Sequence, residues 1–113
     1  MVFDLFAMSN LGSSTTGVAG AVLWVSSGDP SGDHHHVGPR LWVVLGDTIN
    51  PKALADAVIV KLTDPPDVLG TLPPEVAGQV TRFIEANLVV LLDYWDTAIS
   101  TREMLDLLKR VTP

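Results

Sequence analysis

The chain has 113 residues, 47% of them hydrophobic, a size and composition typical of one packed domain rather than of a disordered chain. Its 13 acidic and 7 basic residues give a net charge of −6 with no basic cluster, so we expect no nucleic-acid partner. The absence of cysteine excludes disulfides, thiolate catalysis and cysteine-based zinc sites. The apolar stretches are shorter than the ~18 residues that span a bilayer, so we expect no membrane association. We therefore expect a cytoplasmic protein.

The N-terminal part of the chain differs in composition from the rest. Residues 9–17 are small and polar and predict a flexible lead-in. The apolar residues Phe3, Leu5 and Phe6 precede it, either as an arm that docks on a neighbour or as a frayed end. We therefore divide the chain into a flexible or arm-like segment, 1–16, and a single domain, 17–113.

Two apolar runs flank a loop of turn-forming residues. The run from Gly17 to Ser26 predicts a strand rich in Val and Trp, and Arg40–Leu45 predicts a second strand. The second run contains no polar residue after Arg40, which indicates that both of its faces are covered or that one face covers a partner. Asn50 followed by Pro51 is typical of a helix start, so we expect a short helical turn over Pro51–Ala55.

A third strand and two helices complete the pattern. Ala57–Thr63 alternates with a period of two, and Val68–Leu69 adds a last short strand. Apolar positions then recur at steps of three and four from Val76 to Ile99, which predicts a long amphipathic helix. The sequence from Ser100 to Glu103 is a capping box that starts a second helix. The predicted fold is α+β: a small antiparallel sheet of three to four strands, covered by the long helix and followed by the short one.

All three histidines lie side by side in the loop between the first two strands. In an extended segment His34 and His36 point to the same side, where Asp33 completes a candidate site for a divalent metal. The alternative is an exposed loop with solvated histidines, because the triplet lacks the spacing of known zinc motifs. Asp33, His35 and the nearby serines include the residue types of a catalytic triad but lack a nucleophile elbow, and we assign no catalytic residue.

Polar residues of the long helix are weaker candidates. Asp93 and Asp96 are helical neighbours that, with Glu85, have the chemistry of acid–base catalysis. The alternative, which we favour, is a solvated helix face. Asn87 lies on or beside the apolar stripe, where a buried amide would need a partner, either a strand end or its own copy in a dimer. The alternative, which we favour, is a boundary position at the edge of the stripe.

The apolar surface exceeds what three strands and two helices normally hide. A surplus of this kind is typical of a protein interface, so we expect a homo-oligomer or a small protein partner. The candidate interface residues are Trp24, Trp42, Val44, Val89, Val90 and Trp95.

The order of motifs resembles a known family. Asp33, His34 and His36 lie in a turn between strands, and Gly70-Thr71-Leu72-Pro73 leads into a helix that closes on Trp95. Over about residues 18–96 this is similar to the bacterial domain-of-unknown-function family 4160. The resemblance implies a small bacterial protein in toxin–antitoxin-like arrangements, with no established activity. The contiguous histidines and the second capped helix depart from the family pattern.

We therefore expect a non-enzymatic protein-interaction module, toxin–antitoxin-like or regulatory, that needs no cofactor. The alternative is a small metal-dependent hydrolase or nuclease that holds a divalent metal on the loop of His34 and His36. Metal content separates the two hypotheses.

Overall fold

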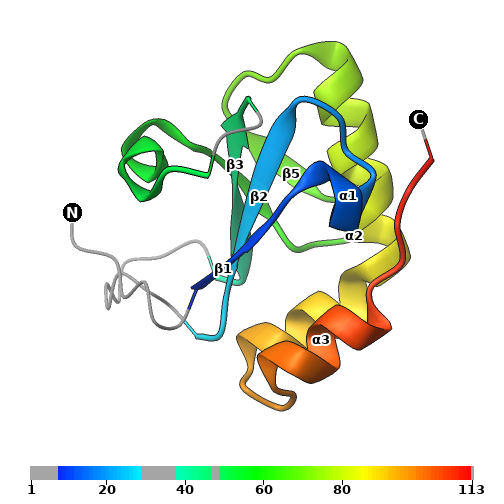
Figure 1. Cartoon of the computed structure of the whole chain (residues 1–113). Helices are drawn as coiled ribbons and strands as arrows, with labels where there is room; N and C mark the ends of the chain where they lie inside the picture. Colours follow the sequence, from blue (N-terminus) through cyan, green and yellow to red (C-terminus); the bar gives the residue numbers. More distant parts are fainter. Residues whose placement is uncertain (1–7, 29–37, 47–48, 113) are drawn as a thin grey trace.

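In this computed structural model, the described residues are 8–28, 38–46 and 49–112. They form a sheet with a long helix on one side and a short 3₁₀-helix on the other (Figure 1). The elements in chain order are β1 (Met8–Leu11), α1 (Ser13–Thr16), β2 (Ala21–Ser26), β3 (Arg40–Leu45), the 3₁₀-helix η2 (Pro51–Asp56), β4 (Val58–Lys61), β5 (Asp67–Leu69), α2 (Pro74–Trp95) and α3 (Thr101–Leu107).

The sheet has five strands in chain order, β1-β2-β3-β4-β5, and each neighbouring pair is antiparallel. The predicted α+β class and antiparallel sheet are confirmed, whereas the expected count of three to four strands is too low. The additional strand is β1, which pairs Met8 with Ser26 and Leu11 with Leu23. Residues 8–16, predicted as part of a lead-in, therefore form a strand and a helical turn of the domain.

The first strand escapes a search for apolar runs because its middle is polar. Met8 and Leu11 are three residues apart and are buried on opposite faces of the sheet, while Ser9 and Asn10 lie between them. The single turn of α1 then ends at Gly17, whose φ is +80°. A Cβ on Gly17 would also lie 1.8 Å from the carbonyl oxygen of Val111. Both the positive φ and this close approach of the backbone therefore require glycine at this position.

The predicted strand Arg40–Leu45 coincides with β3. Its apolar residues alternate between the faces: Leu41 and Val43 point to the side of α2, and Trp42 and Val44 point to the other side. The unbroken apolar run thus reflects a strand that is buried on both faces. The preceding strand, β2, begins at Ala21 rather than at Gly17 and is buried throughout.

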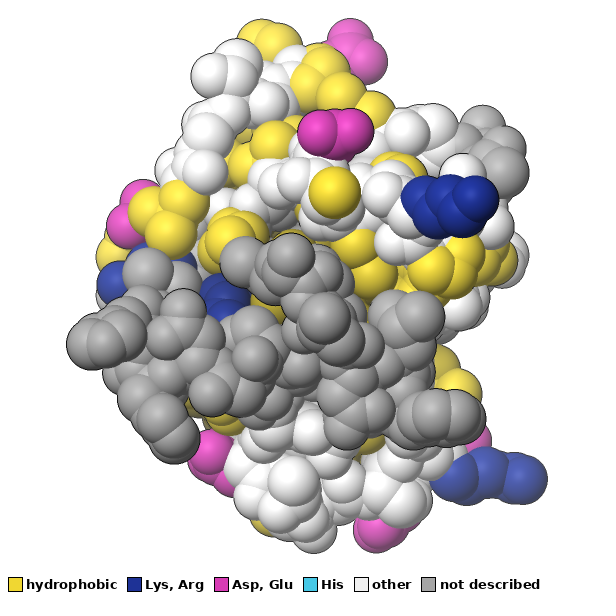
Figure 2. Space-filling view, turned by 90° about the vertical axis from the view of Figure 1, so that its left-hand side faces the viewer, with side chains coloured by type: hydrophobic (Ala, Val, Ile, Leu, Met, Phe, Trp, Pro, Cys, Tyr) yellow, Lys and Arg dark blue, Asp and Glu magenta, His cyan; other side chains and the backbone are white. Residues whose placement is uncertain are grey.

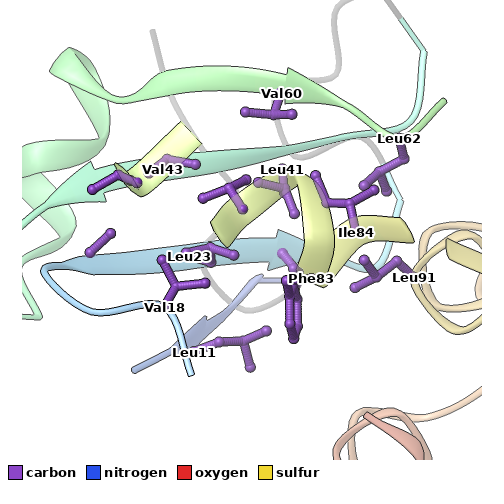
Figure 3. Close-up of a cluster of buried hydrophobic side chains, with 14 of the residues drawn as sticks. Leu11, Val18, Leu23, Leu41, Val43, Val60, Leu62, Phe83, Ile84 and Leu91 are labelled. Atoms are coloured by element: carbon purple, nitrogen blue, oxygen red, sulfur yellow. The ribbon is translucent and has the colours of Figure 1, made fainter. Parts of the chain in front are cut away.

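The larger core lies between the sheet and α2 (Figure 3). Side chains from four strands meet Phe83, Ile84 and Leu91 of the helix, and fully burying an aliphatic or Phe side chain contributes about 1.5–3 kcal/mol. The fully buried residues labelled in the figure include Leu11, Val18, Leu23, Leu41, Val43 and Val60.

A second, smaller core lies on the opposite face of the sheet. Its buried members are Met8, Val22, Trp24, Trp42, Val44 and Leu54. Leu54 comes from η2, and the half-buried Trp95 comes from the end of α2. The strands thus bury apolar side chains on both faces, which accounts for much of the apolar content that the sequence alone leaves unexplained.

The short elements follow their local signals. Asn50 caps η2 by accepting a hydrogen bond of 3.0 Å from the backbone N–H of Lys52, and the predicted helical turn is a 3₁₀-helix. The capping box of α3 is also present: the Glu103 N–H donates to the Ser100 hydroxyl (3.1 Å), and the Ser100 N–H donates to the Glu103 carboxylate (3.0 Å).

The long helix is kinked at Asn87, which has a non-helical φ of −126° and ψ of 15°. The side chain is 2% exposed, and its amide donates to the carbonyl oxygens of Phe83 and Lys109, both at 2.9 Å. Its oxygen accepts from the Lys109 N–H at 2.7 Å. The partner of Asn87 is thus the segment after α3, which Val111 also ties to Thr16 through a backbone hydrogen bond of 2.9 Å.

Candidate functional site

The predicted metal site lies outside the described residues. Asp33, His34 and His36 all fall within residues 29–37, as does His35. Among the residues that the structure describes, no three His, Cys, Asp or Glu side chains gather as a candidate metal site. The hypothesis of a metal site in this loop therefore stays a prediction.

The described ends of this loop are anchored beside two tryptophans. The backbone N–H of Gly28 donates to the carbonyl oxygen of Trp95 at 2.9 Å, and Arg40 donates from Nη1 to the carbonyl oxygen of Gly38 at 2.9 Å. The Arg40 guanidinium carbon lies 5.2 Å from the ring centre of Trp42 and 5.3 Å from that of Trp95.

This cluster holds a buried cation. Arg40 is only 6% exposed, and the electron-rich faces of two indole rings lie near its guanidinium. The rings of Trp42 and Trp95 are stacked, with centres 6.4 Å apart and planes 26° apart. The arrangement joins the start of β3 to the end of α2 and so fixes both described ends of the histidine loop against the sheet.

Three of the six predicted interface residues are buried within the chain. Trp24 and Trp42 are 4% and 2% exposed, Val44 is also buried, and all three belong to the second core. Figure 2 shows the side of the molecule on which η2 lies, where hydrophobic side chains are visible beside the undescribed residues and charged side chains are scattered. These three residues therefore contribute little to the chain's exposed surface.

The other predicted interface residues belong to α2. Val89 is 70% exposed, while Val90 and Trp95 are half-buried. Val89 borders a hollow at the corner between α2 and the end of α3, which we call the corner hollow. It is lined by Glu85, Ala86, Asn87, Leu88, Val89, Val90, Leu107 and Lys109. Because Leu107 is 54% exposed, two large apolar side chains meet at one place on the surface.

Two further hollows continue along the outer side of α2. One lies between the helix and the C-terminal segment and is lined by Arg82, Glu85, Ala86, Arg110, Val111 and Thr112. The other lies near the start of the helix and is lined by Pro74, Glu75, Gly78, Gln79 and Arg82. Neighbouring hollows share Glu85 or Arg82, so the three hollows form a continuous row along the outer side of α2.

The acidic residues do not assemble into one site. Asp93 is half-buried in the last turn of α2, Asp96 is exposed just beyond it, and Glu85 is two or more turns away on the same helix. A solvated helix face accounts for their positions.

Sequence reasoning found Val89 and Val90 but did not single out Arg82, Leu107 or Arg110. The available signal was the recurrence of exposed positions three and four residues apart on the long helix, opposite its apolar stripe. The contribution of Leu107 was not visible in this way, because it depends on how α3 folds back against α2.

The comparisons with known proteins identify no relative. No family model, curated protein or solved structure matches the chain. Within the described residues, no helix is both long enough and apolar enough to cross a membrane.

Proposed function

We propose that this chain is a non-enzymatic protein-interaction module, acting in a regulatory or toxin–antitoxin-like pair or as a homo-oligomer. The corner hollow is the observation that supports the proposal most strongly. Single exposed apolar residues are ordinary on protein surfaces, but Val89 and Leu107 border one hollow together with the half-buried Leu88 and Val90.

The chemistry of the hollow suits a protein surface better than a small polar substrate. Its apolar side chains are bordered by one acid, Glu85, and one base, Lys109. An apolar centre with a charged rim is the usual anatomy of a protein interface. An amphipathic helix or loop would place an apolar side chain against Val89 and Leu107 and keep its polar groups at the rim.

The size of the hollow predicts modest affinity. Complete burial of a Val or Leu side chain contributes about 1.5–3 kcal/mol, and both side chains are already partly buried. Association also costs translational, rotational and side-chain entropy, so the hollow alone supports weak binding.

An apolar dye tests the proposal on the purified chain. We expect the native protein to enhance the fluorescence of anilinonaphthalene sulfonate. Val89→Glu and Leu107→Glu should remove most of the enhancement, because each places a negative charge in the hollow that repels the anionic dye. Leu45→Glu is the matched control, since Leu45 is 51% exposed on β3 and does not line the hollow. Native protein that binds no dye and stays monomeric would contradict the proposal.

Metal analysis tests the alternative of a metal-dependent hydrolase or nuclease. Protein purified without an affinity tag is expected to carry no stoichiometric divalent metal and to melt at the same temperature with and without chelator. Stoichiometric zinc or manganese, together with a chelator-sensitive melting temperature, would overturn the non-enzymatic hypothesis and favour a site at His34 and His36.

A further inference from the structure

The outward side of α2 has its own pattern of residues. Opposite the buried face of the helix, exposed or half-buried positions recur at steps of three and four, and we call them the outer stripe. The outer stripe consists of Glu75, Gly78, Arg82, Glu85, Ala86 and Val89. It extends along α2 from the first turn to Val89, which lies two residues past the kink at Asn87, and the C-terminal segment flanks it beside Arg82, Glu85 and Ala86.

The stripe contains a projection and a recess. Val89 projects, with 70% of its surface exposed. Gly78 has no side chain and lies in the hollow near the start of the helix, where an added Cβ would meet only the Arg82 guanidinium, at 3.9 Å. Because that contact is the far end of a flexible side chain, the recess at Gly78 becomes accessible when Arg82 turns away.

The stripe also contains two opposite charges without a partner. Arg82 and Glu85 are three residues apart, and in the described part of the chain neither forms an ion pair or a side-chain hydrogen bond. Both are exposed, and together they line the hollow beside the C-terminal segment. Around Arg82 and Glu85 the face is therefore electrostatically self-complementary, while Glu75 adds a second acid in the first turn of the helix.

The two pairs of residues, Gly78 with Val89 and Arg82 with Glu85, are placed symmetrically about one point of the helix. The midpoint between Gly78 and Val89 in the sequence is also the midpoint between Arg82 and Glu85. Two antiparallel helices related by a two-fold axis at this midpoint would place Val89 of each copy over Gly78 of the other. In the same register, Arg82 of each copy lies opposite Glu85 of the other, so four contacts form from one alignment.

We propose that the outer stripe of α2 binds the same stripe of a second copy of this chain, antiparallel, with Val89 seated at Gly78 and Arg82 paired with Glu85 across the two-fold axis. This inference rests on the proposed function and names the partner. Ala86 and Gly78 allow the helix backbones to approach closely. Each chain carries a net charge of −6, so random encounters are repelled, and the two ion pairs select this register.

The contact is limited to one helix and its flanks, so we expect a reversible dimer with a Kd of about 0.1 mM rather than an obligate one. Its mass is measured by sedimentation velocity over protein concentrations up to about 1 mM, which covers this affinity range. High salt is expected to weaken the dimer, because the Arg82–Glu85 pairs lie near solvent and are screened.

Charge reversal tests the register. Arg82→Glu creates two Glu–Glu contacts and Glu85→Arg two Arg–Arg contacts, so each is expected to raise the Kd at least ~10-fold. The double variant Arg82→Glu/Glu85→Arg restores both pairs and should return to within ~3-fold of the native Kd. The matched control is Arg102→Glu/Asp106→Arg, which reverses an exposed ion pair of 3.9 Å on α3 and should leave the dimer unchanged.

A second variant tests the recess without altering charge. Gly78→Leu fills the position that Val89 of the other copy would occupy and is expected to abolish the dimer. It should also keep or raise the melting temperature, because leucine favours a helix over glycine.

The outcomes separate this inference from the proposed function. Native protein that stays monomeric at ~1 mM, or a double charge reversal that fails to restore association, overturns the outer-stripe dimer. Dye binding at the corner hollow would then still support an interaction module with a different partner. Loss of dye binding and of association together would overturn both.

Discussion

Asn87→Ala is the perturbation whose cost follows most directly from the structure. The substitution removes three hydrogen bonds: one to Phe83 within α2, and two that hold the backbone of Lys109. Each bond contributes about 1 kcal/mol net, and a buried carbonyl left without its partner adds a desolvation cost of about 1–3 kcal/mol. Water can reach the two partly buried Lys109 contacts, so we expect a total loss of about 3 kcal/mol in the free energy of unfolding.

For a domain of this size, a loss of 3 kcal/mol lowers the melting temperature by about 10 °C. Urea unfolding measures the free energy, and amide exchange measures whether the Lys109 N–H loses its protection. Asn10→Ala is the matched control, because Asn10 is exposed on β1. We expect the control to change stability by less than ~0.5 kcal/mol.

Two results would refute the reasoning about Asn87. An Asn87→Ala protein as stable as the native one, within ~0.5 kcal/mol, would mean that the kink does not depend on these bonds. Unchanged exchange at Lys109 would mean that the C-terminal segment is held by other contacts.

Two further substitutions probe the same packing. Gly17→Ala is expected to lower the free energy of unfolding in urea by at least ~2 kcal/mol more than Gly20→Ala does. Both glycines have positive φ (+80° and +76°), but only a Cβ at Gly17 would meet the Val111 backbone, at 1.8 Å. Equal costs would show that the C-terminal segment gives way freely. Tyr94→Phe removes the hydrogen bonds of the hydroxyl with Ser9 (3.1 Å) and Thr101 (2.9 Å). We expect it to lower the free energy of unfolding by about 1–2 kcal/mol in the same measurement. A stability equal to the native value would show that these hydrogen bonds contribute nothing.

Local signals predicted much of the fold. The strand β3 and the capping box at Ser100 and Glu103 follow from patterns within six residues, and the structure has them where they were expected. The start of η2 at Pro51 likewise follows from its cap. Such elements are decided by backbone and side-chain chemistry that acts between near neighbours, so a single sequence suffices to find them.

The first strand was missed because tertiary pairing decides it. Ser9 and Asn10 have weak strand propensity, and β1 exists because β2 offers a ladder and because Met8 and Leu11 reach the two cores. The kink at Asn87 has a similar origin. The sequence shows that a buried amide needs partners, but the partner, Lys109, lies 22 residues away.

The candidate site was predicted only in part. The sequence indicates excess apolar surface but does not say which of it a second layer hides, so Trp24 and Trp42 were grouped with Val89. The tryptophans are buried in the second core, while Val89 remains exposed beside Leu107. The proposed pairing of Gly78 with Val89 and of Arg82 with Glu85 could be inferred only once the exposed side of α2 was known.

Mixing the two single charge variants tests the account most directly. Arg82→Glu and Glu85→Arg are each expected to be monomeric alone at ~0.2 mM, because like charges face each other at both symmetric positions. Mixed in equal amounts, one chain presents two acids and the other two bases, so light scattering should report a heterodimer that high salt dissociates. A mixture that stays monomeric, or a native protein that stays monomeric up to ~1 mM, would contradict the account.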